Sequence, residues 1–176
     1  MLRFTKAEEQ ALRLSMRLAE TGRLLNLGEL AELEQLPEPT VAKLLSMMRR
    51  GGIVVAVRGR NGGYELATDP AHISVAAVLK ALGSDPAPSH PCLEKDQSQT
   101  DCPRLGDCGL RSVWRHLQGQ VARLLEGTSL ADLLLAEQDV GTHVNNLWPQ
   151  RADLETAETL AAATGRERLN EGVDFR

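Results

Sequence analysis

The order of helical and extended segments within residues 5–66 constrains the fold of this chain more than any single motif. Apolar residues there recur with the i, i+3, i+4, i+7 spacing of an amphipathic helix: Val41, Leu44, Leu45 and Met48. We expect this helix to close at residues 49–52 (Arg-Arg-Gly-Gly), because cations suit its C-terminal dipole and glycine suits a left-handed stop. Residues 53–57 and 63–66 then flank a glycine-rich turn and predict a two-stranded hairpin.

Two shorter helical segments precede the amphipathic one. Thr5 is followed three residues later by Glu8, which is the pattern of a capping box, and Gly22 is a natural end for that helix. A second short helix is expected over residues 27–33, and prolines then separate it from the third. Helix, short helix, turn, helix and hairpin in this order predict a mainly α fold, a winged helix-turn-helix with a two-stranded wing.

The second half of the chain has a different organisation. A fourth helix is expected over residues 74–82, and the segment 84–109 then holds four of the eight prolines and all three cysteines. A loop of this length inside a compact domain is uncommon unless it is functional or disordered. An apolar helical stripe follows it: Leu110, Val113, Trp114, Leu117, Val121, Leu124 and Leu125. Such a helix needs a partner surface, and a second copy of the chain would supply one.

A further short helix is expected over residues 128–134, and past Val140 the chain is polar and aperiodic. We therefore divide the chain into four parts: a DNA-binding domain (1–83), a cysteine-containing cluster-binding loop (84–109), a dimerisation helix with a short following helix (110–139) and a polar tail whose composition allows mobility (140–176).

Charge and targeting signals narrow the class of protein. The net charge is −4, but residues 1–60 carry ten Lys/Arg and seven Asp/Glu (net +3), whereas residues 61–176 carry ten and seventeen (net −7). Positive charge confined to one module suits a protein that meets phosphates on one face. No apolar run is long enough to span a bilayer and no export signal precedes the first helix, so we expect a cytoplasmic protein with no membrane partner and reduced thiols.

The DNA-contacting residues are expected on the third helix and on the hairpin. The N-terminal end of a recognition helix faces the base edges, which makes Thr40 and Lys43 candidates. Arg58, Arg60 and Asn61 lie in or beside the wing, where glycines allow close approach to a phosphate or to the minor groove. Two further candidates end the helix, Arg49 and Arg50. An alternative role for this pair is to complement the helix dipole, and an alternative for the wing is an ordinary hairpin.

The cysteines have the spacing Cys92-x9-Cys102-x5-Cys108. Thiolates select iron–sulfur clusters, zinc or copper(I), and neither interval is the short clip typical of structural zinc. Prolines and glycines beside the cysteines fit a loop whose amides turn inward toward sulfur. Two alternatives stay open: three unliganded thiols, and a thiol redox switch in which Cys102 and Cys108 pair.

These elements together resemble the winged-helix iron–sulfur transcription regulators, the family typified by the iron–sulfur assembly regulator IscR, the nitric-oxide sensor NsrR and the iron-responsive regulator RirA. The resemblance rests on residues 12–18, on residues 44–54 leading into Val57-Arg58-Gly59-Arg60-Asn61-Gly62-Gly63-Tyr64, on the cysteine loop and on Val113-Trp114. It implies a homodimer that clasps through residues 110–125, carries one iron–sulfur cluster per subunit (2Fe-2S or 4Fe-4S) and binds a palindromic operator of double-stranded DNA.

The chain departs from this family pattern at two places. The interval between Cys92 and Cys102 holds nine residues where the assembly regulator has five, and Arg111 stands where that regulator places a histidine ligand. A guanidinium cannot ligate iron, so the fourth ligand must lie elsewhere. Similarity to the nitric-oxide sensor implies a carboxylate on the first helix of the other subunit, which makes Glu9 the candidate and Glu8 its competitor. Other potential ligands are His90, Glu94, Asp101, Asp107 and His116.

The sequence therefore predicts a dimeric transcription regulator whose operator binding is controlled by an iron–sulfur cluster that senses redox state, nitric oxide or iron. The first alternative is a cluster-free regulator of the same fold with a thiol/disulfide switch. An enzyme or electron carrier has little support, because the sequence contains no nucleophile with a neighbouring base and no phosphate-binding loop.

Overall fold

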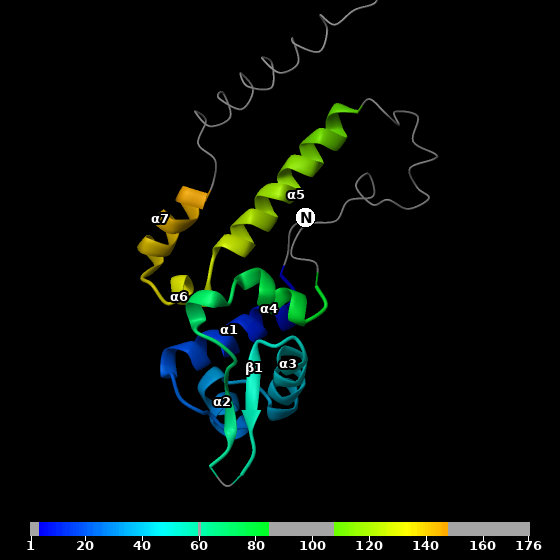
Figure 1. Ribbon diagram of the computed structural model, residues 1–176. Coiled ribbons are helices and arrows are strands. Elements are labelled where there is room, and N and C mark those ends of the chain that lie inside the picture. Colours follow the sequence, from blue (N-terminus) through cyan, green and yellow to red (C-terminus); the bar gives the residue numbers. More distant parts are fainter. Residues whose placement is uncertain (1–3, 60, 85–107, 148–176) are drawn as a thin grey trace, which may run out of the picture.

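The computed structural model describes residues 4–59, 61–84 and 108–147, which form a mainly helical protein with a two-stranded antiparallel sheet (Figure 1). The elements follow in the order α1 (Lys6–Thr21), α2 (Leu27–Glu34), α3 (Glu38–Arg50), β1 (Val54–Val57), β2 (Gly63–Leu66), η1 (Pro70–His72), α4 (Val75–Ala81), α5 (Gly109–Gly127), α6 (Leu130–Leu133) and α7 (Glu137–Leu147). None of the helices in these ranges combines the length and apolar character needed to cross a bilayer.

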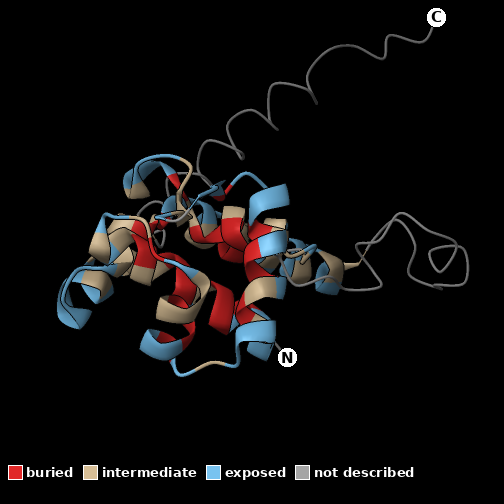
Figure 2. Ribbon diagram, turned by 90° about the horizontal axis from the view of Figure 1, so that it is seen from below, coloured by how far each residue is buried: buried red, intermediate tan, exposed pale blue. Residues whose placement is uncertain are grey.

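Helix α1 lies at the centre of the fold, in contact with α2, α3, α4, α6 and β2. Thr5 and Glu8 form the capping box that the sequence predicts, and Gly22 ends the helix in the left-handed region with φ of 58°. The inward face of α1 is fully or almost fully buried at Ala11, Leu14 and Leu18. Figure 2 shows this arrangement, with buried residues on the inward faces of the helices and exposed residues outside.

Helices α2 and α3 form the helix-turn-helix. The four apolar residues that predict the third helix, Val41, Leu44, Leu45 and Met48, are all buried against the core. A buried carboxylate holds α2 to α1, because Glu34 accepts hydrogen bonds from Nε of Arg13 at 3.0 Å and from Nε of Arg17 at 2.8 Å. The outer face of α3 is exposed to solvent, and it carries Lys43, Ser46, Arg49 and Arg50.

The wing is formed by β1 and β2, which pair antiparallel from Val54 opposite Leu66 to Val57 opposite Gly63. A backbone bridge between Leu25 and Tyr64 attaches the wing to the start of α2, with N···O distances of 3.0 and 2.8 Å. Gly63 permits this attachment, since a Cβ at that position would lie 2.6 Å from the carbonyl oxygen of Leu25. The predicted winged helix-turn-helix is confirmed.

The C-terminal helices extend from the end of the winged domain that is opposite the wing tip (Figure 1). Backbone hydrogen bonds from Val75 to Thr128 (2.9 Å) and from Leu130 to Ile73 (2.8 Å) fix the end of α5 and the start of α6 to the beginning of α4. The N-terminal half of α5 rises away from the winged domain in Figure 1.

One expectation from the sequence is wrong. The chain past Val140 is not aperiodic throughout, because residues 140–147 continue α7, whose side chains are at most half-buried. The helix was missed because Val140, Val144 and Leu147 give only a weak apolar stripe around Gly141. The rest of the predicted tail, residues 148–176, lies outside the described residues.

We predict that Gly51→Ala destabilises the fold, because its new Cβ would lie 2.3 Å from the Cβ of Ala81 on α4. Overpacking of this kind typically lowers the free energy of unfolding by about 1–3 kcal/mol. Urea denaturation of the variant measures the loss, and the double variant with Ala81→Gly should recover only part of it, because the Cα of residue 81 would still lie 2.8 Å from the new Cβ. Equal stability of Gly51→Ala and the parent chain would contradict this close contact between α3 and α4.

Candidate nucleic-acid interface and anchors of the cysteine loop

A cleft of about 430 Å³ lies between the outer face of α3, the wing and the start of α2. Arg49 comes to it from the C-terminal turn of α3 and Arg58 from the residue after β1, so two consecutive elements direct guanidinium groups to one surface. The lining residues are Asn26, Leu27, Ser46, Arg49, Ala56, Val57, Arg58, Gly62, Gly63 and Tyr64. This combination of polar groups and arginines suits a phosphate backbone.

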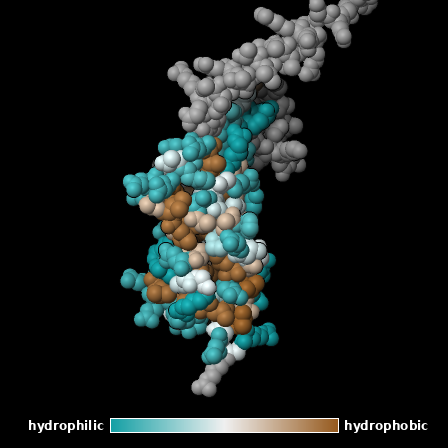
Figure 3. Space-filling view, turned by 60° about the vertical axis from the view of Figure 1, so that its left-hand side comes forward, coloured by the Kyte–Doolittle hydropathy of each residue, from teal (hydrophilic) through white to brown (hydrophobic). Residues whose placement is uncertain are grey.

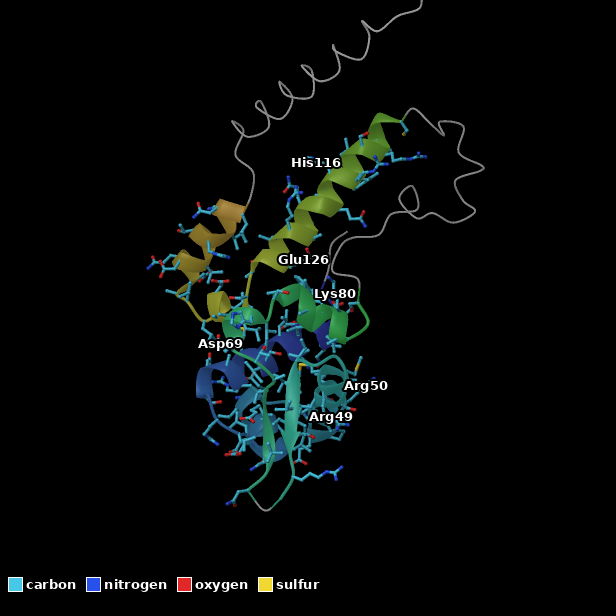
Figure 4. All side chains as sticks on the ribbon, viewed as in Figure 1. Arg49, Arg50, Asp69, Lys80, His116 and Glu126 are labelled. Carbon is cyan, nitrogen blue, oxygen red and sulfur yellow. The ribbon has the colours of Figure 1, made fainter. Side chains whose placement is uncertain are left out.

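The cations around this cleft are available for a ligand. Lys43, Arg49, Arg50 and Arg58 are exposed, and none is ion-paired within the described part of the chain. Figure 4 shows Arg49 and Arg50 on the winged domain, far from His116 on α5. Unpaired cations that share one face produce a positive potential that attracts an anionic polymer.

The other predicted DNA contacts have different positions. Thr40 is half-buried near the start of α3, and neither Thr40 nor Lys43 lines the cleft. Asn61 is exposed at the wing turn, where the N–H of Gly62 donates to the carbonyl of Gly59 at 3.0 Å. Arg60 lies outside the described residues.

Sequence reasoning missed two polar residues of the cleft. Ser46 precedes Arg49 by three residues, so helical periodicity alone could have placed it on the same face. Asn26 had no such signal, because its side chain caps α2 by accepting from the N–H of Glu29 at 2.9 Å. Its place in the cleft depends on the long-range pairing of Leu25 with Tyr64.

The structure separates the two candidate carboxylates at the start of α1. Glu8 is buried, with its carboxylate 2.5 Å from the backbone N–H of Thr5. Burial raises the pKa of Glu8, but hydrogen bonds from the Ser84 side chain and from Thr5 outweigh it and hold the pKa below its ordinary value. Glu9 is exposed and makes no ion pair within the described residues. Glu9 is therefore the carboxylate that is open to an outside ligand.

The structure describes the residues at both ends of the cysteine loop, and it shows the entry anchored to α1 and α4. At its entry, Ser84 donates to the buried Glu8, and its N–H donates to the carbonyl of Leu79 at 3.2 Å. At its exit, Cys108 is half-buried directly before α5 and has no side-chain capping role. The entry of the loop is thus tied to the N-terminal turn of α1, beside Glu9.

The fit of this region to an iron–sulfur cluster rests on the chemistry of its donors. Cys108 places its sulfur at the N-terminus of a 19-residue helix, where free backbone amides can donate to an anionic group. Arg111 lies one turn later, and its buried Nε has no hydrogen-bond partner among the residues that the structure describes. His116 lies two turns beyond Cys108, with Nε2 3.3 Å from Nε2 of Gln120. This environment fits an anionic group bound through sulfur.

The remaining ligand candidates lie outside the described residues: Cys92, Cys102, His90, Glu94, Asp101 and Asp107. Within residues 4–59, 61–84 and 108–147, no three His, Cys, Asp or Glu side chains gather closely enough to hold a metal ion. Two of the predicted metal ligands, Cys92 and Cys102, thus lie in the part of the loop outside the described residues, whereas Cys108 lies at its end.

The chain is similar in sequence and in structure to known proteins. The family model named Rrf2, described as an iron-dependent transcriptional regulator, matches residues 4–136. The HTH-type transcriptional regulator slr0846 of Synechocystis sp. is 40% identical over 104 residues, which cover 59% of this chain and 67% of that protein.

Two solved structures are similar over three quarters of the chain. IscR of T. potens is 26% identical with a TM-score of 0.57, and the match covers 76% of this chain and 86% of that one. CymR of B. subtilis, the global cysteine regulator, has a TM-score of 0.62 at 24% identity and covers 76% of this chain and 96% of its own. The likeness to CymR supports the fold.

We predict that Arg49→Ala and Arg58→Ala weaken binding to all DNA sequences alike, because each removes a phosphate contact. Fluorescence anisotropy over a salt series measures the effect, and the slope of log K against log salt should fall by about 1 for each arginine that contacts a phosphate. Lys6→Ala is the matched control, because Lys6 is exposed at the start of α1 and does not line the cleft. Unchanged affinity in both arginine variants would exclude this cleft as the interface.

A second prediction concerns Glu8. Because its pKa is depressed in the folded state, its carboxylate adds stability that is complete above the ordinary value of 4.5 and is lost as the pH falls through the folded value. Glu8→Ala should therefore lower the free energy of unfolding by about 1 kcal/mol at pH 7, and the difference from the parent chain should shrink in acid.

Urea denaturation at pH 7 and pH 3 measures this difference. Glu9→Ala is the control, since an exposed side chain without an ion pair should leave the stability unchanged within about 0.5 kcal/mol. If Glu8→Ala and Glu9→Ala have the same effect at pH 7, Glu8 is not the capping carboxylate.

Proposed function

Since this chain belongs to the Rrf2 family of DNA-binding transcription regulators and is thus not an enzyme, we propose that it is a homodimeric regulator whose operator binding is controlled by an iron–sulfur cluster. Cys92, Cys102 and Cys108 would hold this cluster, together with Glu9 of the partner subunit. The observation that carries the proposal is the position of Cys108, which starts a long helix with an exposed apolar face at the end of an anchored loop.

The apolar face of α5 supports dimerisation. Leu110, Val113 and Leu117 are 57%, 60% and 39% exposed, and they share one stripe of the helix with the buried Val121. Within the described residues, α4 and α7 are the helices with which α5 makes its main contacts. A second α5 would cover the remaining stripe and bury it from water.

The ligand set follows from which groups are already engaged. Glu8 serves the capping box and the loop entry, whereas Glu9 points away from the core as an exposed carboxylate. A carboxylate is a harder ligand than the thiolates beside it, so the iron that it binds is more easily released or attacked. A sensor requires a labile site of this kind. The bound cluster would supply a group that reacts with oxygen, nitric oxide or a change in iron supply.

The chain connects this loop to the DNA-binding surface through direct contacts. Cys108 begins α5, and the far end of α5 is bonded to the start of α4 through Thr128 and Val75. Helix α4 packs against α1 and α3, and its Lys80 is ion-paired with Glu126 of α5. A change at the loop can therefore shift the population between two positions of α5 and alter the spacing of the two recognition helices in a dimer.

The alternative of a disulfide switch uses the same residues without iron. Cys108 is half-buried rather than sealed in the core, so it is accessible to a second thiol such as Cys102. Mass spectrometry after mild oxidation separates the two proposals: a loss of two hydrogen atoms, whose two electrons pass to the added oxidant, in an iron-free protein that still binds its operator favours the disulfide.

We predict that Val113→Lys converts the dimer to a monomer, because a lysine would place a charge in the centre of the apolar stripe. Analytical ultracentrifugation measures the change, and circular dichroism checks that the helices are kept. Leu33→Lys is a matched control, since Leu33 is 47% exposed on α2, away from α5. A monomeric parent chain, or a Val113→Lys variant that stays dimeric, would contradict dimerisation through α5.

The cluster itself is tested by iron and sulfide analysis, with a visible spectrum, after purification without oxygen. We expect a coloured, iron-containing protein, with the metal lost in each of the single variants Cys92→Ser, Cys102→Ser and Cys108→Ser. Glu9→Ala should hold iron less tightly than the parent chain, and Glu8→Ala should retain it despite lower stability. A colourless parent protein would overturn the proposal.

A further inference from the structure

Helix α5 carries a basic groove on the side opposite its apolar stripe. The groove is lined by Ser112, Arg115, His116, Gly119 and Arg123. Gly119 forms its floor, and the guanidinium of Arg123 lies over it, with Nη1 3.9 Å from the position of an added Cβ. Gly119 follows Leu110 by nine residues, which at 3.6 residues per turn places it half a turn away, so a dimer formed through the apolar stripe leaves the groove open.

The arginines of the groove lack acidic partners within the described residues. Arg13, Arg17 and Arg23 of the winged domain are ion-paired, but Arg115 and Arg123 are not. Glu126, the acidic residue of α5, is held by Lys80 at 3.0 Å. Residues 61–176 carry a net charge of −7, so this concentration of positive charge is not a consequence of composition.

DNA bound at the wing does not account for the groove. In Figure 4, His116 lies on the part of α5 that rises away from the winged domain, whereas Arg49 and Arg50 lie on that domain. On the face that Figure 3 shows, hydrophilic side chains predominate in the upper part of the described surface, and the larger apolar areas lie below them. The two arginines of the groove favour a ligand that carries carboxylates.

Helix α7 packs against the C-terminal end of α5 and runs antiparallel to it. Its last residue, Leu147, packs against Gly127, with its methyl carbons 3.1 and 3.2 Å from the position of an added Cβ. His143 on the same helix lies 3.3 Å from the carbonyl oxygen of Gly127. Figure 1 shows α7 rising from α6 beside the lower part of α5, against the chain direction of α5. Helix α7 therefore ends beside Gly127, and its axis points along α5 toward the turns that carry Arg123 and Arg115.

The sequence after Leu147 contains an acidic segment at the right distance. Asp153, Glu155 and Glu158 lie within residues 153–158, which contain no Lys or Arg. Asp153 follows Leu147 by six residues, which can span up to about 20 Å. Arg123 and Arg115 precede Gly127 by four and twelve residues, which is about 6 and 18 Å along the helix.

We propose that residues 153–158 dock in the basic groove of α5 in the same chain, with Asp153, Glu155 and Glu158 facing Arg115 and Arg123. Because the segment is tethered to α5 through α7, its carboxylates have a high effective concentration at the groove, and ion pairs that are individually weak and screened by salt act together. The docked segment braces the N-terminal half of α5 on the face that dimerisation leaves open. This proposal goes beyond the regulatory function and holds with or without a bound cluster.

Hydrogen exchange of the full-length protein at low ionic strength tests the proposal, read on peptides that cover residues 110–123. In the triple variant Asp153→Lys/Glu155→Lys/Glu158→Lys, exchange should be about three- to tenfold faster than in the parent chain, as expected for the loss of a few exposed ion pairs. Adding Arg115→Glu and Arg123→Glu to this variant reverses the charges of the groove as well as those of the segment, and it should restore slow exchange.

The matched control is Glu167→Lys/Glu171→Lys/Asp174→Lys, which makes the same change in net charge outside the acidic segment. It should leave exchange in α5 unchanged. Equal exchange in the parent chain and in the 153–158 variant, or an equal effect of the two triple variants, would overturn the proposal. Protection that disappears on dilution would also overturn it, because the occupant would then be a second molecule.

Discussion

The packing of α1 at the centre of the fold is the constraint on which the rest of the structure depends. One helix with a fully buried face contacts α2, α3, α4, α6 and β2, so the helix-turn-helix, the wing and the base of the C-terminal helices share one core. Its first turn also fixes the entry of the cysteine loop through Glu8 and Ser84. The helix-turn-helix, the wing and the entry of the cysteine loop are therefore built on one core rather than on separate modules joined by a linker.

The distribution of charge separates structural cations from functional ones. Arginines on α1 and in the following loop are paired with glutamates, and the pairing at the buried Glu34 holds α2 in place. Around the cleft and on the open face of α5, the exposed arginines have no acidic partner within the described residues. A modest excess of positive charge in residues 1–60 can thus serve DNA binding, because it is not consumed by internal ion pairs.

Much of the fold could be predicted from the sequence because its signals are local. The capping box at Thr5, the end at Gly22 and the stripe from Val41 to Met48 each depend on residues within two turns of helix. The contribution of Asn26 to the cleft could not be predicted, because it depends on backbone pairing with the wing across 39 residues, from Leu25 to Tyr64. The contact of Glu8 with Ser84 could not be predicted either, because it joins residues that lie 76 positions apart in the chain.

The central claim is that metal at the cysteine loop and DNA at the wing influence each other through α5 and α4. Two ligands coupled in this way change each other's affinity by the same factor, typically about 5- to 150-fold. The most direct test is the operator Kd of one anaerobic preparation, measured at fixed salt before and after a chelator removes its iron. The account predicts at least a fivefold change that is lost in Cys108→Ser, and an identical Kd in both states would contradict it.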